Sequence, residues 1–169
     1  TPDQQIIEVV KKIGGEAILT KNKHETGTDR VFEVFEKKLN GKPKIIVNLQ
    51  GDMPNIDPDS IKDLVNYMGQ NKCEISTLAG NLSSKSELDD KNIVKVSVKE
   101  KMEPGKFVKA LDFVRKNHKK ELEAYHHIGI YAFTDKALVR YVNLKRSKLE
   151  MERKLEQLRA MENKMLIHV

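Results

Sequence analysis

The stretch KIIVNLQGDMP at residues 44–54 decides the fold of this chain. Three β-branched residues, Ile45, Ile46 and Val47, follow one another between flanking glycines and a proline, which is typical of a strand buried on both faces of a sheet. The polar residues that follow predict a loop at the carboxyl end of that strand. Because open α/β sheets bind ligands beyond the carboxyl ends of their strands, residues 50–54 mark a candidate site.

Apolar residues recur at helical spacing on both sides of this strand. Residues 6–13 and 31–39 predict two amphipathic helices before it, with a short strand at residues 17–19 between them. A helix over residues 60–68 and a strand over residues 75–78 are expected after it. This alternation of helices and strands indicates an α/β fold with a mostly parallel sheet flanked by helices.

The second half of the chain adds a small antiparallel hairpin, in which residues 94–98 pair with residues 107–114. A further buried strand is expected at residues 128–133, two helices at residues 135–142 and 149–163, and a last strand at residues 165–169. A chain of 169 residues has the size of one domain, so we expect a single α/β domain over residues 1–169.

Composition excludes several classes of protein. No apolar run approaches the roughly 18 residues that cross a bilayer, and no signal-like segment opens the chain. The lone Cys73 rules out an internal disulfide and a multi-thiolate zinc site, which fits a reducing compartment. We therefore expect a cytoplasmic protein without membrane insertion.

The formal net charge is +6, and the excess of basic residues lies in the last third of the chain. Such a segment attracts phosphates, sugar acids or nucleic acid, although most of these lysines can equally form a solvated surface. Aromatic residues make up only 5% of the chain, and no base-stacking motif accompanies the charge, so we expect no nucleic-acid partner.

Asp52 has two interpretations. Placed just after a buried strand, its carboxylate could hold Mg²⁺ on a nucleoside triphosphate, because this ion binds to one or two carboxylates together with substrate phosphates. Alternatively, Gly51 and Asp52 form an ordinary turn, and Asp52 caps the helix that follows. Spacing alone leaves both interpretations open.

Two more polar groups stand out. HETGTDR at residues 24–30 runs from a loop into a helix, where Arg30 could bind an anion, or Thr28 could simply be the N-cap residue. His126 and His127 precede a buried strand. Adjacent strand residues point to opposite faces, so these histidines are not expected to chelate one ion together, and one of them could face a pocket.

Four motifs together suggest a family. In residues and in order they resemble motifs of the CMP-Kdo synthetases, or 3-deoxy-manno-octulosonate cytidylyltransferases. The motifs are HETGTDR (24–30), IIVNLQGDMP (45–54), YHHIGIYAF (125–133) and LEQLRAMEN (155–163). The chain resembles this family over almost its whole length. The resemblance implies a nucleotidyltransferase of lipopolysaccharide biosynthesis that transfers CMP from CTP to 3-deoxy-D-manno-octulosonate (Kdo), releases pyrophosphate, uses Mg²⁺ and forms a homodimer.

The resemblance also implies roles for single residues. Asp52 would be the catalytic and metal-binding carboxylate, and Thr28 and Arg30 would lie near the nucleotide. The remaining matches fall in the sugar pocket and are Gln50, Arg115, His127, Tyr131, Glu156 and Gln157.

The chain departs from the family pattern in several places. The family's opening strand and basic triphosphate loop, and its second metal-binding aspartate near the C-terminus, have no counterpart here, and Met53 replaces the usual glutamate. No glycine-rich phosphate loop is present. These departures predict a chain truncated at both ends. The alternative to an enzyme is therefore an inactive remnant, or a structural homologue that binds ligands weakly.

Overall fold

The structure is a computed structural model that describes residues 1–116, 119 and 121–169. By its internal contacts the chain divides into two compact units, Thr1–Lys44 and Ile45–Val169. Each unit has its own set of elements. The expectation of a single domain stays a prediction.

The first unit contains two helices, α1 (Gln4–Lys12) and α2 (Gly27–Lys37). Asp3 caps α1 by accepting a hydrogen bond of 2.8 Å from the amide of Gln5. Residues 17–19 are not a strand, which corrects the prediction. An apolar run forms a strand only beside a partner, and here the backbone makes isolated contacts, such as the one from the Thr20 amide to the Thr1 carbonyl.

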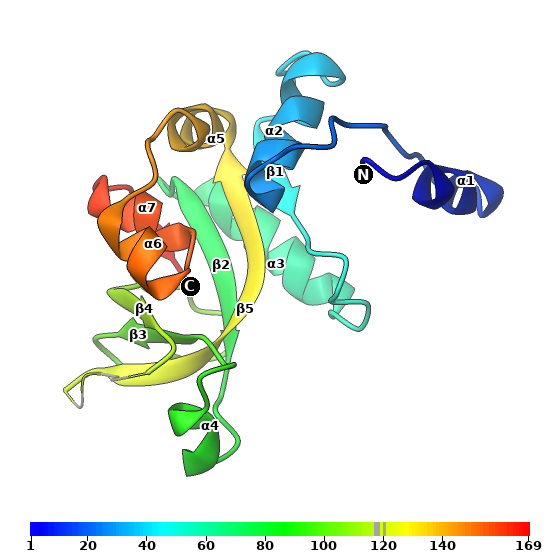
Figure 1. Cartoon of the computed structure of the whole chain (residues 1–169). Coiled ribbons are helices and arrows are strands. Elements are labelled where there is room, and N and C mark those ends of the chain that lie inside the picture. Colours follow the sequence, from blue (N-terminus) through cyan, green and yellow to red (C-terminus); the bar gives the residue numbers. More distant parts are fainter. Residues whose placement is uncertain (117–118, 120) are drawn as a thin grey trace. The chain divides into compact units, whose positions relative to one another are not determined.

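The second unit is built on a six-stranded sheet in the order β4-β3-β5-β2-β6, with β1 also paired to β5 (Figure 1). The long strand β5 connects the two halves of this sheet, because it pairs with β3 near its start, with β2 from His126 to Phe133, and with β1 near its end. The strands are β1 (Ile45–Asn48), β2 (Ile75–Gly80), β3 (Lys95–Val98), β4 (Asp112–Val114), β5 (Glu123–Thr134) and β6 (Ile167–His168).

The α/β class is confirmed, and so is the antiparallel hairpin of β3 and β4. The sheet is mixed, however, which corrects the expectation of mostly parallel pairing. Strand β5 runs antiparallel to β1, β2 and β3, and among the strands of the described residues only β2 and β6 pair in parallel. The error has a physical cause, because a strand buried on both faces reads as the same apolar run in either direction.

The described residues of the second unit form five helices: α3 (Pro58–Gln70), α4 (Lys85–Asp89), α5 (Asp135–Val142), α6 (Lys148–Arg153) and α7 (Gln157–Glu162). The predicted helix over residues 149–163 is in fact two helices. They separate at Lys154, whose φ of 54° is left-handed and cannot continue a helix. No helix in the described ranges combines the length and apolar character needed to span a membrane.

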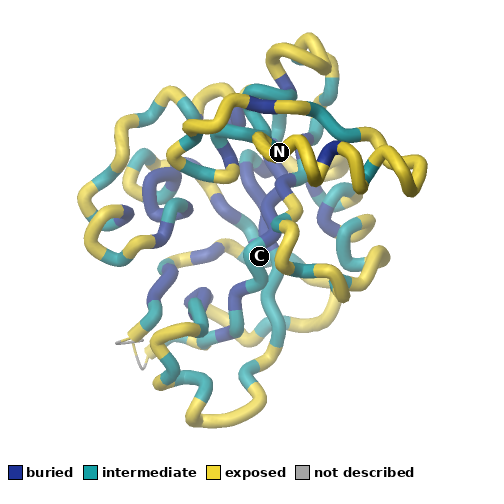
Figure 2. Tube along the Cα trace, turned by 45° about the vertical axis from the view of Figure 1, so that its right-hand side comes forward, coloured by how far each residue is buried: buried dark blue, intermediate teal, exposed yellow. Residues whose placement is uncertain are grey.

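Alternate residues of β5 build a core on each face of the sheet. On one face, Ile130 and Ala132 pack with Leu64 and Met68 of α3. On the other face, Phe133 contacts the ring of Tyr141 from α5. These strand segments are the dark blue, buried stretches in Figure 2. Period-two alternation therefore presents two different sets of side chains to the two helical layers.

Lys95 on β3 is fully buried, and its ammonium donates hydrogen bonds to the carbonyls of Asp90 (2.7 Å), Ile93 (2.8 Å) and Arg115. Burial lowers its pKa below the ordinary value. Lys95→Met removes three charge-assisted bonds, so we expect the free energy of unfolding to fall by about 3 kcal/mol in urea titrations. Lys99→Met, at an exposed position, is the control. Equal stability of the two variants would contradict the expectation.

Candidate functional site

A row of aromatic rings crosses one face of the sheet in the second unit. The ring of His127 lies 5.0 Å from that of Phe113 and 5.4 Å from that of Tyr131. The row continues through Phe133, 6.2 Å from Tyr131, to Tyr141 of α5. Three of these residues alternate along β5, so one strand fixes their spacing. This aromatic row brings together His127 and Tyr131, two of the predicted sugar-pocket residues.

His127 is buried, and its Nε2 lies 2.9 Å from the Thr77 hydroxyl. That hydroxyl has one proton, which it donates to the carbonyl of Ile130 at 2.6 Å or that of Ile128 at 3.2 Å. Nε2 of His127 must therefore carry the proton in this contact, which leaves Nδ1 as the acceptor. Burial, and to a lesser degree His126, lowers the pKa of His127 to about 3. The imidazole is neutral at physiological pH.

A small recess lies beside the aromatic row, lined by Tyr131, Tyr141, Glu156 and Gln157 together with apolar residues of β2, β5, β6 and α7. Its free space of about 10 Å³ is roughly what one water molecule needs. Burial, with a smaller contribution from Glu156, raises the pKa of Tyr131 well above its ordinary value. Tyr131 is therefore a protonated phenol. Three predicted sugar-pocket residues converge at this recess.

Gln50 and Asp52 follow β1 at the predicted loop. The Gln50 amide donates a hydrogen bond of 3.1 Å to the side chain of Asn48, and a backbone bond from Met53 to Gln50 closes a turn. Asp52 lies within that turn and is exposed. The cap of α3 is Asp57, which excludes the capping role considered for Asp52. The turn itself is compatible with display of the Asp52 carboxylate to a ligand.

The chemistry of Asp52 fits a magnesium ion that arrives with a nucleotide. Over the residues that the structure describes, no group of three or more histidine, cysteine, aspartate or glutamate side chains could hold a metal by itself. One exposed carboxylate offers hard oxygen donors, and Mg²⁺ commonly completes its shell with phosphates and water. The donor set therefore suits an ion shared with substrate.

Arg115 follows β4 directly and is half-buried. Its guanidinium donates from Nη1 to the carbonyls of Lys91 and Asn92, each at 3.3 Å. The side chain is therefore held against the turn that precedes β3 and is absent from the recess lining. Its role towards a sugar carboxylate stays a prediction.

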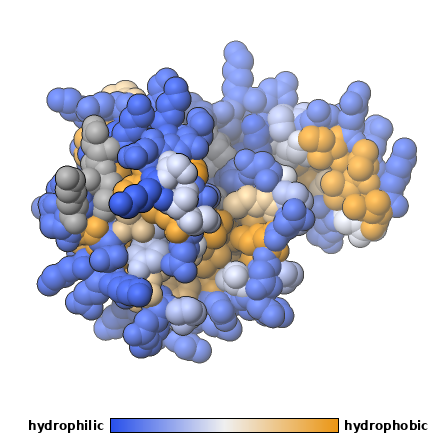
Figure 3. Space-filling model, turned by 90° about the horizontal axis from the view of Figure 1, so that it is seen from below, coloured by the Kyte–Doolittle hydropathy of each residue, from blue (hydrophilic) through white to orange (hydrophobic). Residues whose placement is uncertain are grey.

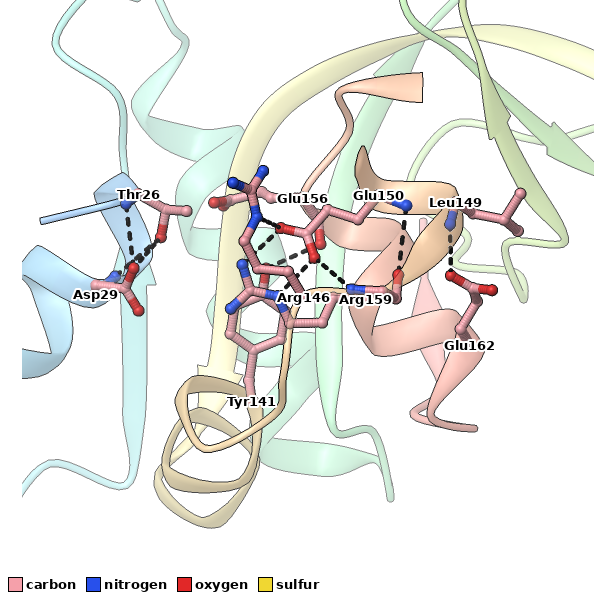
Figure 4. A network of polar contacts seen from close by, with 10 residues as sticks. Thr26, Asp29, Tyr141, Arg146, Leu149, Glu150, Glu156, Arg159 and Glu162 are labelled. Carbon is pink, nitrogen blue, oxygen red and sulfur yellow. Dashed lines mark hydrogen bonds and ion pairs between the residues drawn. The ribbon is translucent and has the colours of Figure 1, made fainter. Parts of the chain in front are cut away.

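In the first unit, Thr26 is the N-cap of α2, and its capping box with Asp29 is drawn in Figure 4. This corrects the interpretation of Thr28 as the N-cap, because Thr28 is the second residue of α2 and is buried. Arg30 donates from Nη1 to the Thr20 hydroxyl at 2.6 Å and so holds the loop before α2. The nucleotide roles of Thr28 and Arg30 stay predictions.

Sequence reasoning missed the residues that support these side chains. Asn48 stands opposite Tyr131 in the β1–β5 register and is the one polar residue within an apolar strand, a signal that was available. Thr77 carries no such signal, because threonine is ordinary in strands.

In the first unit, sequence reasoning also missed Glu33. Its carboxylate accepts hydrogen bonds from the amide of Lys21 and from His24, and these bonds lower the pKa of Glu33 to about 2.

Comparison with known proteins gives consistent results. A family model described as cytidylyltransferase matches residues 1–167. The 3-deoxy-manno-octulosonate cytidylyltransferases of Nitrobacter hamburgensis and Brucella ovis are 40% and 39% identical to this chain; both alignments cover all of it, and 66% and 68% of the respective relatives. A solved structure of CMP:2-keto-3-deoxy-manno-octonic acid synthetase complexed with CTP superposes with a TM-score of 0.84 at 34% identity, over 98% of this chain and 67% of the other. The chain thus spans about two thirds of the length of these relatives.

Proposed function

Because this chain belongs to the cytidylyltransferase family, we propose that it transfers CMP from CTP to the anomeric hydroxyl of Kdo and releases pyrophosphate, a step of lipopolysaccharide biosynthesis. The observation that carries the proposal is the recess where Tyr131, Glu156 and Gln157 meet beside His127. The similarity to a synthetase complexed with CTP supports the choice of nucleotide.

In the proposed reaction, the sugar hydroxyl attacks the α-phosphorus of CTP and releases its proton to water. A new oxygen–phosphorus bond forms, and the bond from the α-phosphorus to the oxygen that bridges to the β-phosphate breaks, so that pyrophosphate leaves. Such a transfer needs positioning and neutralisation of charge more than covalent help from the protein. A single hydroxyl of the sugar would fit the recess, where it could accept a hydrogen bond from the Tyr131 phenol and hydrogen bond in both directions with the amide of Gln157. His127, next to Tyr131 in the aromatic row, is neutral and adds no charge beside the recess.

Charge neutralisation would come from a magnesium ion held by Asp52 and from the basic side chains. Mg²⁺, when bound with CTP, would reduce the charge on the phosphates, and Asp52 would hold it. We assign Thr28 and Arg30 to the nucleotide, and Arg115 to the carboxylate of the sugar acid, for which a guanidinium is suited by its paired donors. Gln50 would face the sugar from the turn after β1.

The direct test is release of pyrophosphate by this chain from CTP, Mg²⁺ and Kdo, with each component omitted in turn. We expect release to require all three. Calorimetric titration with Kdo and with CTP tests the alternative, because an inactive structural homologue should give no heat with either ligand. Binding without pyrophosphate release would support the weak-binding alternative instead.

We also propose that the chain is a cytoplasmic homodimer. The first unit carries a hydrophobic surface on α1 and its C-cap residue, where Ile6, Val9 and Ile13 are 48%, 59% and 80% exposed (Figure 3). Exposed apolar patches of this kind are commonly covered by a partner. Sedimentation velocity at micromolar concentration is expected to show twice the mass of one chain. A monomer under those conditions would contradict this expectation.

A further inference from the structure

A buried ion pair joins two short helices, α6 and α7, of which α7 lines the recess. The guanidinium of Arg159 on α7 binds the carboxylate of Glu150 on α6 through two parallel hydrogen bonds, Nη2 to Oε1 at 2.6 Å and Nε to Oε2 at 2.9 Å. The side chains are only 4% and 1% exposed. This two-point geometry fixes the angle between the partners as well as their distance.

The carboxylate of Glu150 also accepts hydrogen bonds from other residues and so belongs to a larger network (Figure 4). The amide of Ser147 donates to Glu150 Oε2 at 3.0 Å, and Nε of Arg146 donates to Oε1 at 3.2 Å. Burial alone would raise the pKa of Glu150, but the bonds from Arg159 and Ser147 outweigh it and lower the pKa. Glu150 is therefore charged and fully bonded at neutral pH.

The network surrounds the segment that carries two predicted sugar-pocket residues. Glu156 and Gln157 lie between the left-handed Lys154 and the body of α7. The Tyr141 hydroxyl donates to the carbonyl of Glu156 at 2.9 Å, and the guanidinium of Arg159 lies 4.9 Å from the centre of the Tyr141 ring. One side chain, Arg159, thus contacts both the ion-pair partner and the aromatic residue that holds this segment.

We propose that Arg159 and Glu150 are positioning residues that set the geometry of Glu156 and Gln157 for the sugar acid. Each helix has only six residues, too few to be stable by itself, so the angle between them depends on side-chain contacts. The pair is remote in sequence from the proposed metal-binding turn at Asp52. This inference rests on the proposed function, and its effect is confined to the sugar.

The test uses Arg159→Lys in the full chain. Lysine keeps the charge but loses the paired donors and the stacking on Tyr141. We expect KM for Kdo to rise about tenfold, while KM for CTP and kcat stay within about twofold of those of the unmodified chain. The reason is that displacement of Glu156 and Gln157 weakens the binding of Kdo only. Arg140→Lys is the matched control, since Arg140 pairs with Glu74 in an exposed position and contacts α7 at the carbonyl of Asn163, at the end away from Glu156 and Gln157. It should leave every constant unchanged.

Glu150→Gln provides a second variant, because it preserves volume and can still accept one hydrogen bond from Arg159. It should raise KM for Kdo in the same direction, and calorimetry with Kdo alone should show the same loss of affinity without turnover. A lower melting temperature with unchanged Kdo affinity in both variants, or equal changes for Kdo and CTP, would overturn the inference. If the unmodified chain neither binds Kdo nor releases pyrophosphate, the proposed function itself fails.

Discussion

Asp52→Asn is expected to lower release of pyrophosphate from CTP by about 100-fold or more, because an amide is a poorer magnesium ligand than a carboxylate and leaves phosphate charge unneutralised. The side chain is exposed in a closed turn, so the substitution should leave the fold intact. Rates at saturating Mg²⁺ and at several lower concentrations distinguish loss of the ion from loss of the chemistry. A wild-type rate regained at high Mg²⁺ would indicate weakened binding of the ion alone.

The matched control for this prediction is Asp59→Asn. Asp59 lies seven residues further on, its side chain is 76% exposed, and its carboxylate binds Lys62 on the surface of α3. Surface substitutions of this kind have small effects, so the rate should change by less than about twofold. If Asp52→Asn behaves like Asp59→Asn, Asp52 does not bind the metal and the turn interpretation is correct.

The elements of this fold were largely predictable, because hydrophobic period and turn residues are local properties. The strand at Ile45–Asn48 and the helix at Asp135–Val142 lie where the sequence places them. Strand direction was not predictable, since an apolar run carries no direction. The division of the last helix at Lys154 was also missed, because a left-handed lysine depends on the contacts of the folded unit and has no signal such as glycine.

The candidate site shows the same limit. Motif wording selected Tyr131, Glu156 and Gln157, and the structure places all three at one recess. The residues that hold these side chains in place could not be predicted from the motifs, because Glu150 and Arg159 look like ordinary charged residues of an amphipathic helix. Their burial follows from packing between α6, α7 and α5, which is a property of the tertiary structure. Sequence patterns therefore identify candidate ligand contacts more readily than the residues that support them.

The stability of the second unit is expected to fall in mild acid because of His127. The folded pKa is about 3, whereas an imidazole in an unfolded chain titrates near its ordinary value of 6.5. Between these values the unfolded chain binds a proton that the folded chain does not, so the free energy of unfolding decreases as the pH falls from 6.5 towards 3. At pH 4.5 this contribution amounts to a loss of about 3 kcal/mol relative to pH 7.5.

Urea titrations at pH 7.5 and pH 4.5 measure this loss, and His127→Gln isolates it. Glutamine keeps an amide that can donate to Thr77 but cannot titrate. Between pH 7.5 and pH 4.5, the free energy of unfolding of the variant should therefore fall by about 3 kcal/mol less than that of the unmodified chain. Other acid-sensitive groups cancel in this difference. His126→Gln, which alters the half-buried neighbour, should retain most of the pH dependence, because burial is the larger cause of the lowered pKa of His127. An equal pH dependence in the unmodified chain and His127→Gln would mean that His127 is accessible to protons in the folded state and that the aromatic row is open to water.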